Sequence, residues 1–488
     1  MSKEIENRDS RVGIWCQLGV LIIGIALIAG SLGYLVGATA PASAPPTVID
    51  GEGLEAYKIN GIRYANAGDV DSIQDSLDDM LFGGLLIIPS GDYAPLVPIE
   101  VPSNVAITGT GIGTRITWPA AVNGFNLLAN TTNVTITNLY LEGGGAGSQH
   151  GISMTSCQYC TIDGVFLSNW GDDAAIMYGP YSYHNTIRDC IVSDGPEGIE
   201  VVGGYSNQLL NNRIHDITGE AIELRERNWG APLDLRLQGV LVSGNEISGV
   251  TSGIWIYGNV SNARISNNII SDCSANGIYT SQTHSSSYPS LIDISGNTIS
   301  DVAVGIRLMH ANWRDIRAFG NMVSNFISYG FYVSAIGENL TVSQNIFWGG
   351  TGATSDGINI QYAVTRCAIE GNTIGEVGRH GMMLLNLDHI MVQNNHLWDT
   401  GSYGMQVRSG NSSFIGNSIY GFTTRGISLS TIADNCTVIA NLITGGAYGV
   451  YGEVGVFGAI LIGNNFRGCT TGNFTFSEAY IAYGNTPK

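Results

Sequence analysis

The amino-acid sequence predicts an all-β protein: a right-handed, single-stranded parallel β-helix of about 14–15 coils with an N-terminal capping helix, preceded by one transmembrane helix. Three observations lead to this prediction. Short motifs recur about every 23 residues, apolar and polar residues alternate within each repeat, and an uncharged apolar run lies near the N-terminus. Because no repeat can bury its apolar side alone, successive repeats must stack into a continuous core.

The uncharged run at residues 12–36 is predicted to be a transmembrane anchor. About 20 apolar residues suffice to cross a bilayer, whereas the apolar part of a cleaved signal peptide has about 7–15. Residues 38–40 resemble a cleavage site, but Pro41 follows them directly and disfavours cleavage. Close to the run, lysine and arginine occur only on its N-terminal side. The positive-inside rule therefore predicts a cytoplasmic tail at residues 1–11, a stalk at 37–58 and a β-helix outside the cell.

The β-helix is predicted to have an N-terminal cap at residues 59–100, with the coils following at 101–488. Within the cap, residues 71–81 match an amphipathic helix, and Ser72 with Asp75 resembles a capping box. The apolar residues of this helix share one face: Ile73, Leu77, Met80 and Leu81. Such a helix could cover the open first coil, because exposed strand edges favour aggregation.

The first repeated motif has apolar residues at alternate positions, then Gly or Asn, then an asparagine. This asparagine occurs in eleven repeats: Asn212, Asn245, Asn268, Asn297, Asn321, Asn345, Asn372, Asn395, Asn417, Asn441 and Asn464. An inward amide at a turn can bond to the amides of the coils above and below it. We therefore expect a structural ladder of buried asparagines.

The second motif starts with Gly or Ala and continues with alternating apolar residues, as at Ala175 and Gly198. We expect the first and third residues after the Gly or Ala to point inward and the second to point outward. The expected outward row reads Ser153, Met177, Glu200, Glu223, Trp255, Tyr279, Arg307, Tyr332, Asn359, Met383, Gln406, Ser428 and Tyr451.

Six carboxylates are predicted to gather on this outer face: Asp172, Asp173, Glu197, Glu200, Glu220 and Glu223. Adjacent coils lie about 4.8 Å apart, and like charges facing each other across strands are destabilising. A carboxylic acid with a raised pKa beside an ionised partner is the machinery of glycoside hydrolysis, so these six residues are the candidate catalytic groups. The same patch could instead bind Ca²⁺, although the expected hydrolysis requires no cofactor.

Aromatic and basic residues continue the same face and form the candidate substrate-binding set: Arg225, Arg227, Trp229, Trp255, Tyr257, Tyr279, Arg307 and His310. Flat aromatic rings suit sugar rings, and arginine binds uronate carboxylates bidentately. The two longest repeats contain insertions at residues 225–238 and 281–290. We expect these insertions to form loops that border the same face. The alternative interpretation is that these residues form a solvated surface without a binding or catalytic function.

Two segments carry a resemblance to a known superfamily. Residues 86–93, Leu-Ile-Ile-Pro-Ser-Gly-Asp-Tyr, and residues 99–111 look like the opening of the pectate-lyase-like right-handed β-helix superfamily, and the following coils resemble its parallel β-helix repeats. The resemblance covers roughly residues 60–485. It implies the fold, but not the activity, because the superfamily contains lyases, hydrolases, epimerases, tailspikes and non-catalytic surface proteins.

A shorter segment can be compared with the sequence motifs of one enzyme class. Trp170 to Ile176 resembles the G-D-D segment of polygalacturonase-like glycoside hydrolases, which implies acid and base roles for Asp172 and Asp173. The chain departs from that family in four places, and the first is that Asp172 and Asp173 sit one residue too early. The third aspartate is missing from the preceding coil, Pro196-Glu197-Gly198 replaces G-H-G, and no R-I-K is in register. Lysine-dependent lyase chemistry is disfavoured because no lysine occurs between Lys58 and Lys488, whereas an arginine base stays open.

The amino-acid composition limits the kinds of partner and modification that are expected. The formal charge is −19 with only three lysines, which argues against binding nucleic-acid phosphates. Cys157 and Cys160 could be free or form a local disulfide, and Cys367 and Cys436 fall on expected core positions. Seven sequons beyond the anchor permit glycosylation: Asn130, Asn133, Asn259, Asn339, Asn411, Asn435 and Asn473.

These observations predict a cell-surface protein that binds a polysaccharide on the face between Asp172 and Trp313. Hydrolysis there is a secondary hypothesis, with Glu197 and Glu220, or Glu200 and Glu223, as acid and base. The alternative is a non-catalytic structural or adhesive protein of the cell envelope. Members of the superfamily are often trimers, and the sequence leaves the oligomeric state open.

Overall fold

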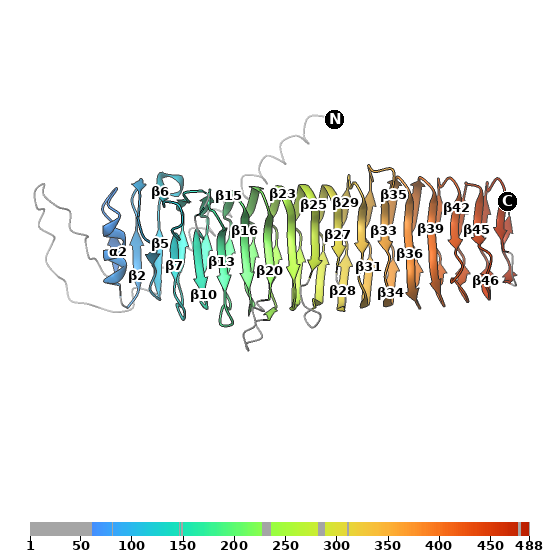
Figure 1. The fold of residues 1–488 in the computed structure, drawn as a ribbon, viewed down its shortest axis with the longest axis horizontal. Helices are drawn as coiled ribbons and strands as arrows, with labels where there is room; N and C mark the ends of the chain where they lie inside the picture. Colours follow the sequence, from blue (N-terminus) through green and yellow to red (C-terminus); the bar gives the residue numbers. More distant parts are fainter. Residues whose placement is uncertain are drawn as a thin grey trace, which may run out of the picture. The chain divides into compact units, whose positions relative to one another are not determined.

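The computed structural model describes residues 61–80, 82–145, 147, 150–226, 236–281, 288–309, 312–476 and 480–487. The predicted tail, anchor and stalk, residues 1–58, lie outside these ranges. No helix within the described ranges has the length and hydropathy needed to cross a bilayer. The described residues form a parallel β-helix of about 17 turns, stacked from the N-terminal blue coils to the C-terminal red ones (Figure 1).

Each coil contributes one strand to each of three columns, and neighbouring strands within a column are parallel. In one coil these strands are β18 (Gln208–Leu210), β19 (Arg213–Ile217) and β20 (Glu220–Arg225). In the first column, Ile187, Leu209 and Val242 of three successive coils are aligned in register and have no solvent exposure. Apolar side chains therefore stack on one another from coil to coil and fill the interior, as the alternating pattern predicts.

The first column runs from β1 (Ile62–Tyr64) to β49 (Tyr480–Tyr483), and the second from β3 (Gly91–Tyr93) to β50 (Thr486–Pro487). The third column consists of β4 (Ile99–Glu100), β7 (Phe125–Leu127), β10 (Ile152–Thr155), β13 (Asp173–Tyr178), β16 (Glu197–Val202), β20, β23 (Glu246–Tyr257), β25 (Ile269–Ser281), β27 (Thr298–Leu308), β30 (Tyr329–Val333), β33 (Asp356–Ile360), β36 (His380–Asp388), β39 (Tyr403–Gly410), β42 (Arg425–Leu429), β45 (Tyr448–Gly452) and β48 (Gly472–Thr475). In β23, β25 and β27 the strands of the second and third columns are continuous.

The asparagine ladder is confirmed. All eleven predicted asparagines are at most 1% exposed. The side-chain nitrogen Nδ2 of Asn245 donates to Oδ1 of Asn268 at 2.9 Å and to the Leu209 carbonyl at 3.0 Å, while the Asn245 backbone N–H donates to the same Oδ1 at 3.0 Å. Because every amide repeats this pattern, the buried turns are satisfied, and the ladder extends to Asn485.

Glycine recurs in the two motifs for two reasons. Gly244 precedes a ladder asparagine at φ +71°, a left-handed conformation that suits Gly or Asn. At Gly253, which starts a second motif, a Cβ would lie 2.5 Å from the carbonyl oxygen of Gly277 in the next coil. The motifs therefore mark tight turns and close backbone contacts between coils.

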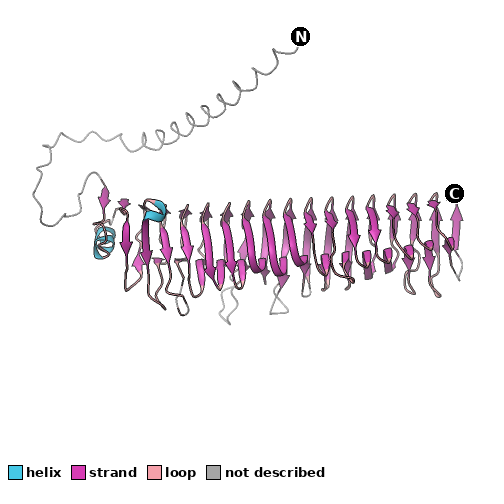
Figure 2. Cartoon of the chain, turned by 90° about the horizontal axis from the view of Figure 1, so that it is seen from above, coloured by secondary structure: helices cyan, strands magenta, loops and turns pink. Residues whose placement is uncertain are grey.

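The N-terminal region differs from the prediction. Helix α2 (Asp71–Asp78) is shorter than expected, and Asp69, rather than a Ser72 capping box, accepts the first helical N–H groups. Gln74 of α2 exchanges hydrogen bonds with the backbone of Glu100 in β4, at the start of the third column. A separate cap over residues 59–100 is not evident, because β1 and β3 already pair within the columns. Coils therefore begin earlier than predicted, and α2 and a short 3-10 helix, η1 (Gly111–Gly113), lie near this end (Figure 2).

Cys157 and Cys160 are buried free thiols, so the alternative of a local disulfide between them is not seen. Cys367 and Cys436 are buried in the core as predicted. These cysteines act as small apolar side chains.

Candidate functional site

The outer side of the third column brings the predicted acidic and aromatic residues into one row. Side chains in direct register along this row are Ile176, Glu200, Glu223, Trp255, Tyr279, Arg307 and Tyr332. Met177, which was predicted to point outward, is buried, because the motif of this coil starts at Ala174 and not at Ala175. This shift of one residue places Asp173 directly beside Glu197 of the next coil.

Glu200 and Glu223 are buried carboxylates held by one arginine. They are 2% and 3% exposed. Arg225, in the strand of Glu223, forms an ion pair with Glu200 through Nε and reaches Glu223 Oε1 through Nη1 at 3.5 Å. Burial raises the pKa of both glutamates to about 8, although Arg225 acts in the opposite direction. The guanidinium group of Arg225 therefore contacts both carboxyl groups. Their pKa values of about 8 keep them largely protonated near neutral pH.

Asp173 lies in the most crowded part of the acidic cluster. Its carboxyl group is 2% exposed, and burial, followed by the charges of Glu197 and Asp172, raises its pKa well above the usual value. His150 of the preceding coil places Nδ1 at 3.2 Å from Asp173 Oδ2. Burial lowers the pKa of His150, which leaves its imidazole neutral despite the nearby carboxylates.

Glu197 and Glu220 are half-exposed, in contrast to the buried pair. Glu220 accepts a 2.8 Å hydrogen bond from the hydroxyl of Tyr279, two coils farther along the column. Burial, together with the charge of Glu220, raises the pKa of Tyr279, so that this phenol is a hydrogen-bond donor. The solvent-facing carboxylates of the cluster are therefore Glu197 and Glu220, together with the half-exposed Asp172.

Three aromatic side chains adjoin the carboxylates. The rings of Trp255 and Tyr279 are stacked with centroids 5.5 Å apart and planes at 8°, and Tyr257 meets Trp255 edge-on at 4.8 Å. The indole N–H of Trp255 donates to the hydroxyl of Ser281 at 2.6 Å. These contacts hold the half-exposed rings upright beside Glu223 and Glu220.

Of the other predicted binding residues, Arg307 continues the row directly after Tyr279. Arg307 lies over the ring of Tyr332, with 5.5 Å from its guanidinium carbon to the ring centroid. Trp313, expected on the outer face, is fully buried in β28 (Trp313–Phe319) of the first column. Arg227, Trp229 and His310 lie outside the described residues.

Comparison with protein families identifies the fold family. The model described as "right handed beta helix region" matches residues 123–231, 150–312, 230–347 and 350–476, which together cover more than half of the chain. The chain belongs to the right-handed β-helix family. A search of curated proteins finds no match to this β-helix protein.

Solved structures similar to this β-helix protein include three carbohydrate-related proteins. The catalytic unit of a GH87 α-1,3-glucanase from Streptomyces thermodiastaticus strain HF3-3 is 16% identical with a TM-score of 0.44, covering 74% of this chain and 67% of that one. The A-module of a mannuronan C-5 epimerase from Azotobacter vinelandii is 14% identical (TM-score 0.41; 73% and 92% covered). A tailspike of E. coli bacteriophage HK620, in complex with a pentasaccharide, is 13% identical (TM-score 0.46; 83% and 76% covered). At these identities the likeness concerns the fold alone.

The sequence reasoning for this β-helix protein missed two contributions to the site. His150 is absent from the residues predicted to form the site, yet it contacts Asp173 and its side chain is only 19% exposed. Its position immediately before Gly151 of the second motif was the available signal. Arg225 was assigned to substrate, whereas the structure engages it with Glu200 and Glu223.

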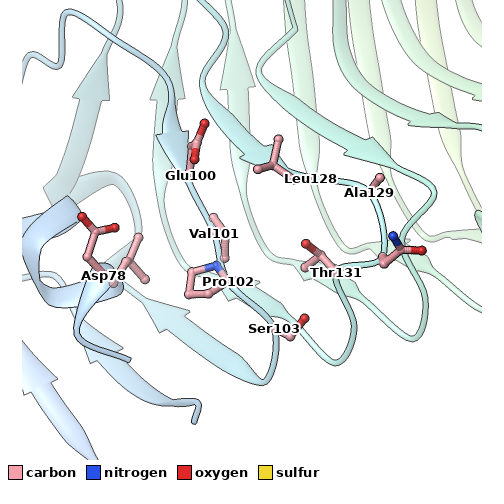
Figure 3. Close-up of a pocket in the computed structure, with 10 residues that line it drawn as sticks. Asp78, Glu100, Val101, Pro102, Ser103, Leu128, Ala129 and Thr131 are labelled. Carbon is pink, nitrogen blue, oxygen red and sulfur yellow. The ribbon is translucent and has the colours of Figure 1, made fainter. Parts of the chain in front are cut away.

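A pocket of about 440 Å³ lies elsewhere in this β-helix protein, between α2 and the turns that follow β4 and β7 (Figure 3). Its lining is Leu77, Asp78, Glu100, Val101, Pro102, Ser103, Leu128, Ala129, Asn130 and Thr131. The carboxylate of Asp78 accepts a hydrogen bond from Gln74 at 2.7 Å. Because this lining contains only two carboxylates, Asp78 and Glu100, and no aromatic ring, we place the candidate site at the third column.

Proposed function

We propose that the protein binds a polysaccharide chain along the outer face of the third column, between Asp173 and Tyr279. The observation that carries this proposal is the direct register of Glu200, Glu223, Trp255 and Tyr279 on one row, with half-exposed aromatic rings beside the carboxyl groups. Aromatic rings offer apolar surface to sugar rings, and carboxylates accept hydrogen bonds from sugar hydroxyls. A row that crosses several coils suits a polymer better than a small molecule.

Hydrolysis of the bound chain is the second part of the proposal. Glu197 and Glu220 are the preferred acid and base, because Glu200 and Glu223 are buried and engaged with Arg225. Glu220 accepts a hydrogen bond from Tyr279, which suits the base, and Glu197, half-exposed beside Asp173, is the remaining candidate for the acid. Burial lowers the pKa of Arg225, but its interactions with Glu200 and Glu223 outweigh this effect and raise it, which disfavours this arginine as the base of a lyase.

The test is incubation of the purified protein with a panel of uronate and neutral polysaccharides, with binding and reducing-end release measured separately. We expect one glycan class to bind and to be cleaved, and Glu220→Gln and Glu197→Gln to bind that glycan without cleaving it. If a glycan binds but no glycan yields a product, the result would favour the alternative of a non-catalytic adhesive protein. Absence of binding across the panel, or full activity of Glu220→Gln, would reject the corresponding part of the proposal.

We further propose that residues 12–36 anchor the protein in the membrane with the β-helix outside the cell. The length of the uncharged run and the basic residues that precede it support this arrangement. Protease treatment of intact cells expressing the full chain should remove the β-helix and leave a short membrane-bound fragment. Protection of the β-helix, or its recovery in the soluble fraction, would contradict this arrangement.

A further inference from the structure

Three potential metal ligands meet at the first coils of the acidic cluster. His150 immediately precedes the second motif of its coil, and Asp172 and Asp173 lie at the start of β13. One ligand atom from each of these side chains lies within 4.8 Å of the other two. The backbone N–H of Gly151 donates to the Asp173 carbonyl, which holds the two coils together at this point.

We infer that His150, Asp172 and Asp173 form a binding site for one divalent first-row metal ion, Zn²⁺ or Mn²⁺. Two ligand atoms bound to the same ion at about 2.1 Å lie roughly 3.0–3.4 Å apart when they are adjacent in a tetrahedral or octahedral shell. The 3.2 Å between His150 Nδ1 and Asp173 Oδ2 falls in this range. Two carboxylates and one imidazole leave further coordination positions for water.

A second observation points to a ligand. Asp173 is 2% exposed, and its Oδ1 has no hydrogen-bond partner; Nδ1 of His150 also has none. A buried carboxylate oxygen without a partner is costly, and a bound cation would remove this cost by supplying positive charge at the place where the carboxylates repel one another.

The ligand set favours Zn²⁺ or Mn²⁺ over Ca²⁺. Ca²⁺ takes about 6–8 oxygen ligands, whereas imidazole suits first-row transition metals and zinc. Only two of the three side chains here offer oxygen. The inference therefore names a different ion from the Ca²⁺ considered from the sequence.

A second His–Asp pair on the same face provides the matched control. Asp356 and His380 are paired in register in neighbouring coils of the third column. His150 and Asp173 are neighbours in the same column, but there the histidine belongs to the earlier coil. Both carboxylate oxygens of Asp356, however, already accept hydrogen bonds. Arg379 Nε donates to Oδ1 at 2.9 Å, and Asn359 Nδ2 donates to Oδ2 at 2.6 Å. Asp356 therefore has its positive partner already, and we expect no metal at that pair.

Isothermal titration of the metal-free protein with Zn²⁺, Mn²⁺ and Ca²⁺ tests the inference without any glycan. We expect one Zn²⁺ or Mn²⁺ ion per chain, bound at least about tenfold more tightly than Ca²⁺. His150→Gln and the half-exposed Asp172→Asn should each weaken binding by about tenfold or more, and His380→Gln should leave it unchanged. Circular dichroism of every variant confirms that it is folded.

Three outcomes would overturn the inference: no saturable binding of Zn²⁺ or Mn²⁺ below about 1 mM, Ca²⁺ binding as tight as Zn²⁺, or unchanged binding in folded Asp172→Asn. None of these depends on glycan binding or cleavage, so that the metal site and the proposed function can fail separately.

Discussion

The hydroxyl of Tyr279 donates a 2.8 Å hydrogen bond to Glu220, which belongs to a strand two coils earlier in the third column. This contact joins the aromatic stack to the solvent-facing carboxylates. Because a carboxylate that accepts a charge-assisted hydrogen bond is held in one orientation, the contact connects the binding and chemical parts of the proposed site.

Tyr279→Phe should reduce hydrolysis without preventing glycan binding. The ring remains stacked on Trp255, whereas Glu220 loses its donor, and we expect kcat to fall by about tenfold with little change in KM. Steady-state kinetics on the cleaved glycan provide the measurement. Tyr332→Phe removes a hydroxyl from the same row, one that donates to Gln361, and serves as the control. Equal rates for Tyr279→Phe and the native protein would contradict the proposed role of the hydrogen bond.

Trp255→Ala should weaken glycan binding by about tenfold or more, since buried aromatic contacts dominate binding energies. Affinity electrophoresis in gels containing the glycan would show the loss as increased mobility. Trp348→Ala is the matched control, because Trp348 is 40% exposed but lies in β32 (Ile346–Trp348) of the second column. A similar loss in both variants would place glycan binding outside the third column.

Asn345→Ala should lower the free energy of unfolding by about 2 kcal/mol or more. The substitution removes the acceptor for Asn321 and the donor to Asn372 and the Ala318 carbonyl, all of them buried. Urea unfolding followed by tryptophan fluorescence measures the change. Asn485→Ala, at the C-terminal end of the ladder where burial is partial, should cost less than about 1 kcal/mol. Equal costs at both positions would argue against a cooperative buried ladder.

Stability should fall as the pH rises between about 5 and 8. The folded state raises the pKa of Glu223 from the ordinary 4.5 to about 8, and it therefore binds more protons than the unfolded state in this window. The contribution is fully present below the unfolded pKa and is lost as the pH passes the folded one. Thermal unfolding midpoints across this range should decline less steeply for Glu223→Gln.

The control for this pH dependence is Glu246→Gln, whose side chain is 59% exposed. It should reproduce the slope of the native protein. A midpoint that rises with pH in the native protein, or an identical slope for Glu223→Gln, would show that the buried carboxyl groups do not retain their protons. Both unfolding series should be run with a chelator, so that metal binding does not alter the carboxylates.

Much of the fold could be predicted because inward positions recur with the repeat. An asparagine at the same position of successive coils, such as Asn245 and Asn268, has one buried environment available to it. The number of coils was underestimated because residues 59–100 were predicted to be a cap, whereas β1 and β3 already pair within the columns. The error at Ala174 had a different origin, since two adjacent alanines fit the second motif equally well.

The candidate site was predictable only in part. Repeat phase alone placed Glu200, Glu223, Trp255 and Tyr279 in one row, because side-chain direction alternates strictly along a strand. It could not show that Arg225 would contact two buried glutamates, or that His150 would approach Asp173. The contacts of Arg225 with Glu200 and of His150 with Asp173 join different coils, and they depend on side-chain conformations that no periodicity specifies.

The stacked coils, the buried asparagines and the acidic and aromatic face all follow from the order of residues in this chain, because a repeat with one apolar side has few ways to exclude water. The division of the six acidic residues into buried proton-holding groups and solvent-facing ones was decided by the packing between coils. Burial and charge at each carboxyl group depend on neighbours from other turns of the helix, and these neighbours are defined only when the chain is folded.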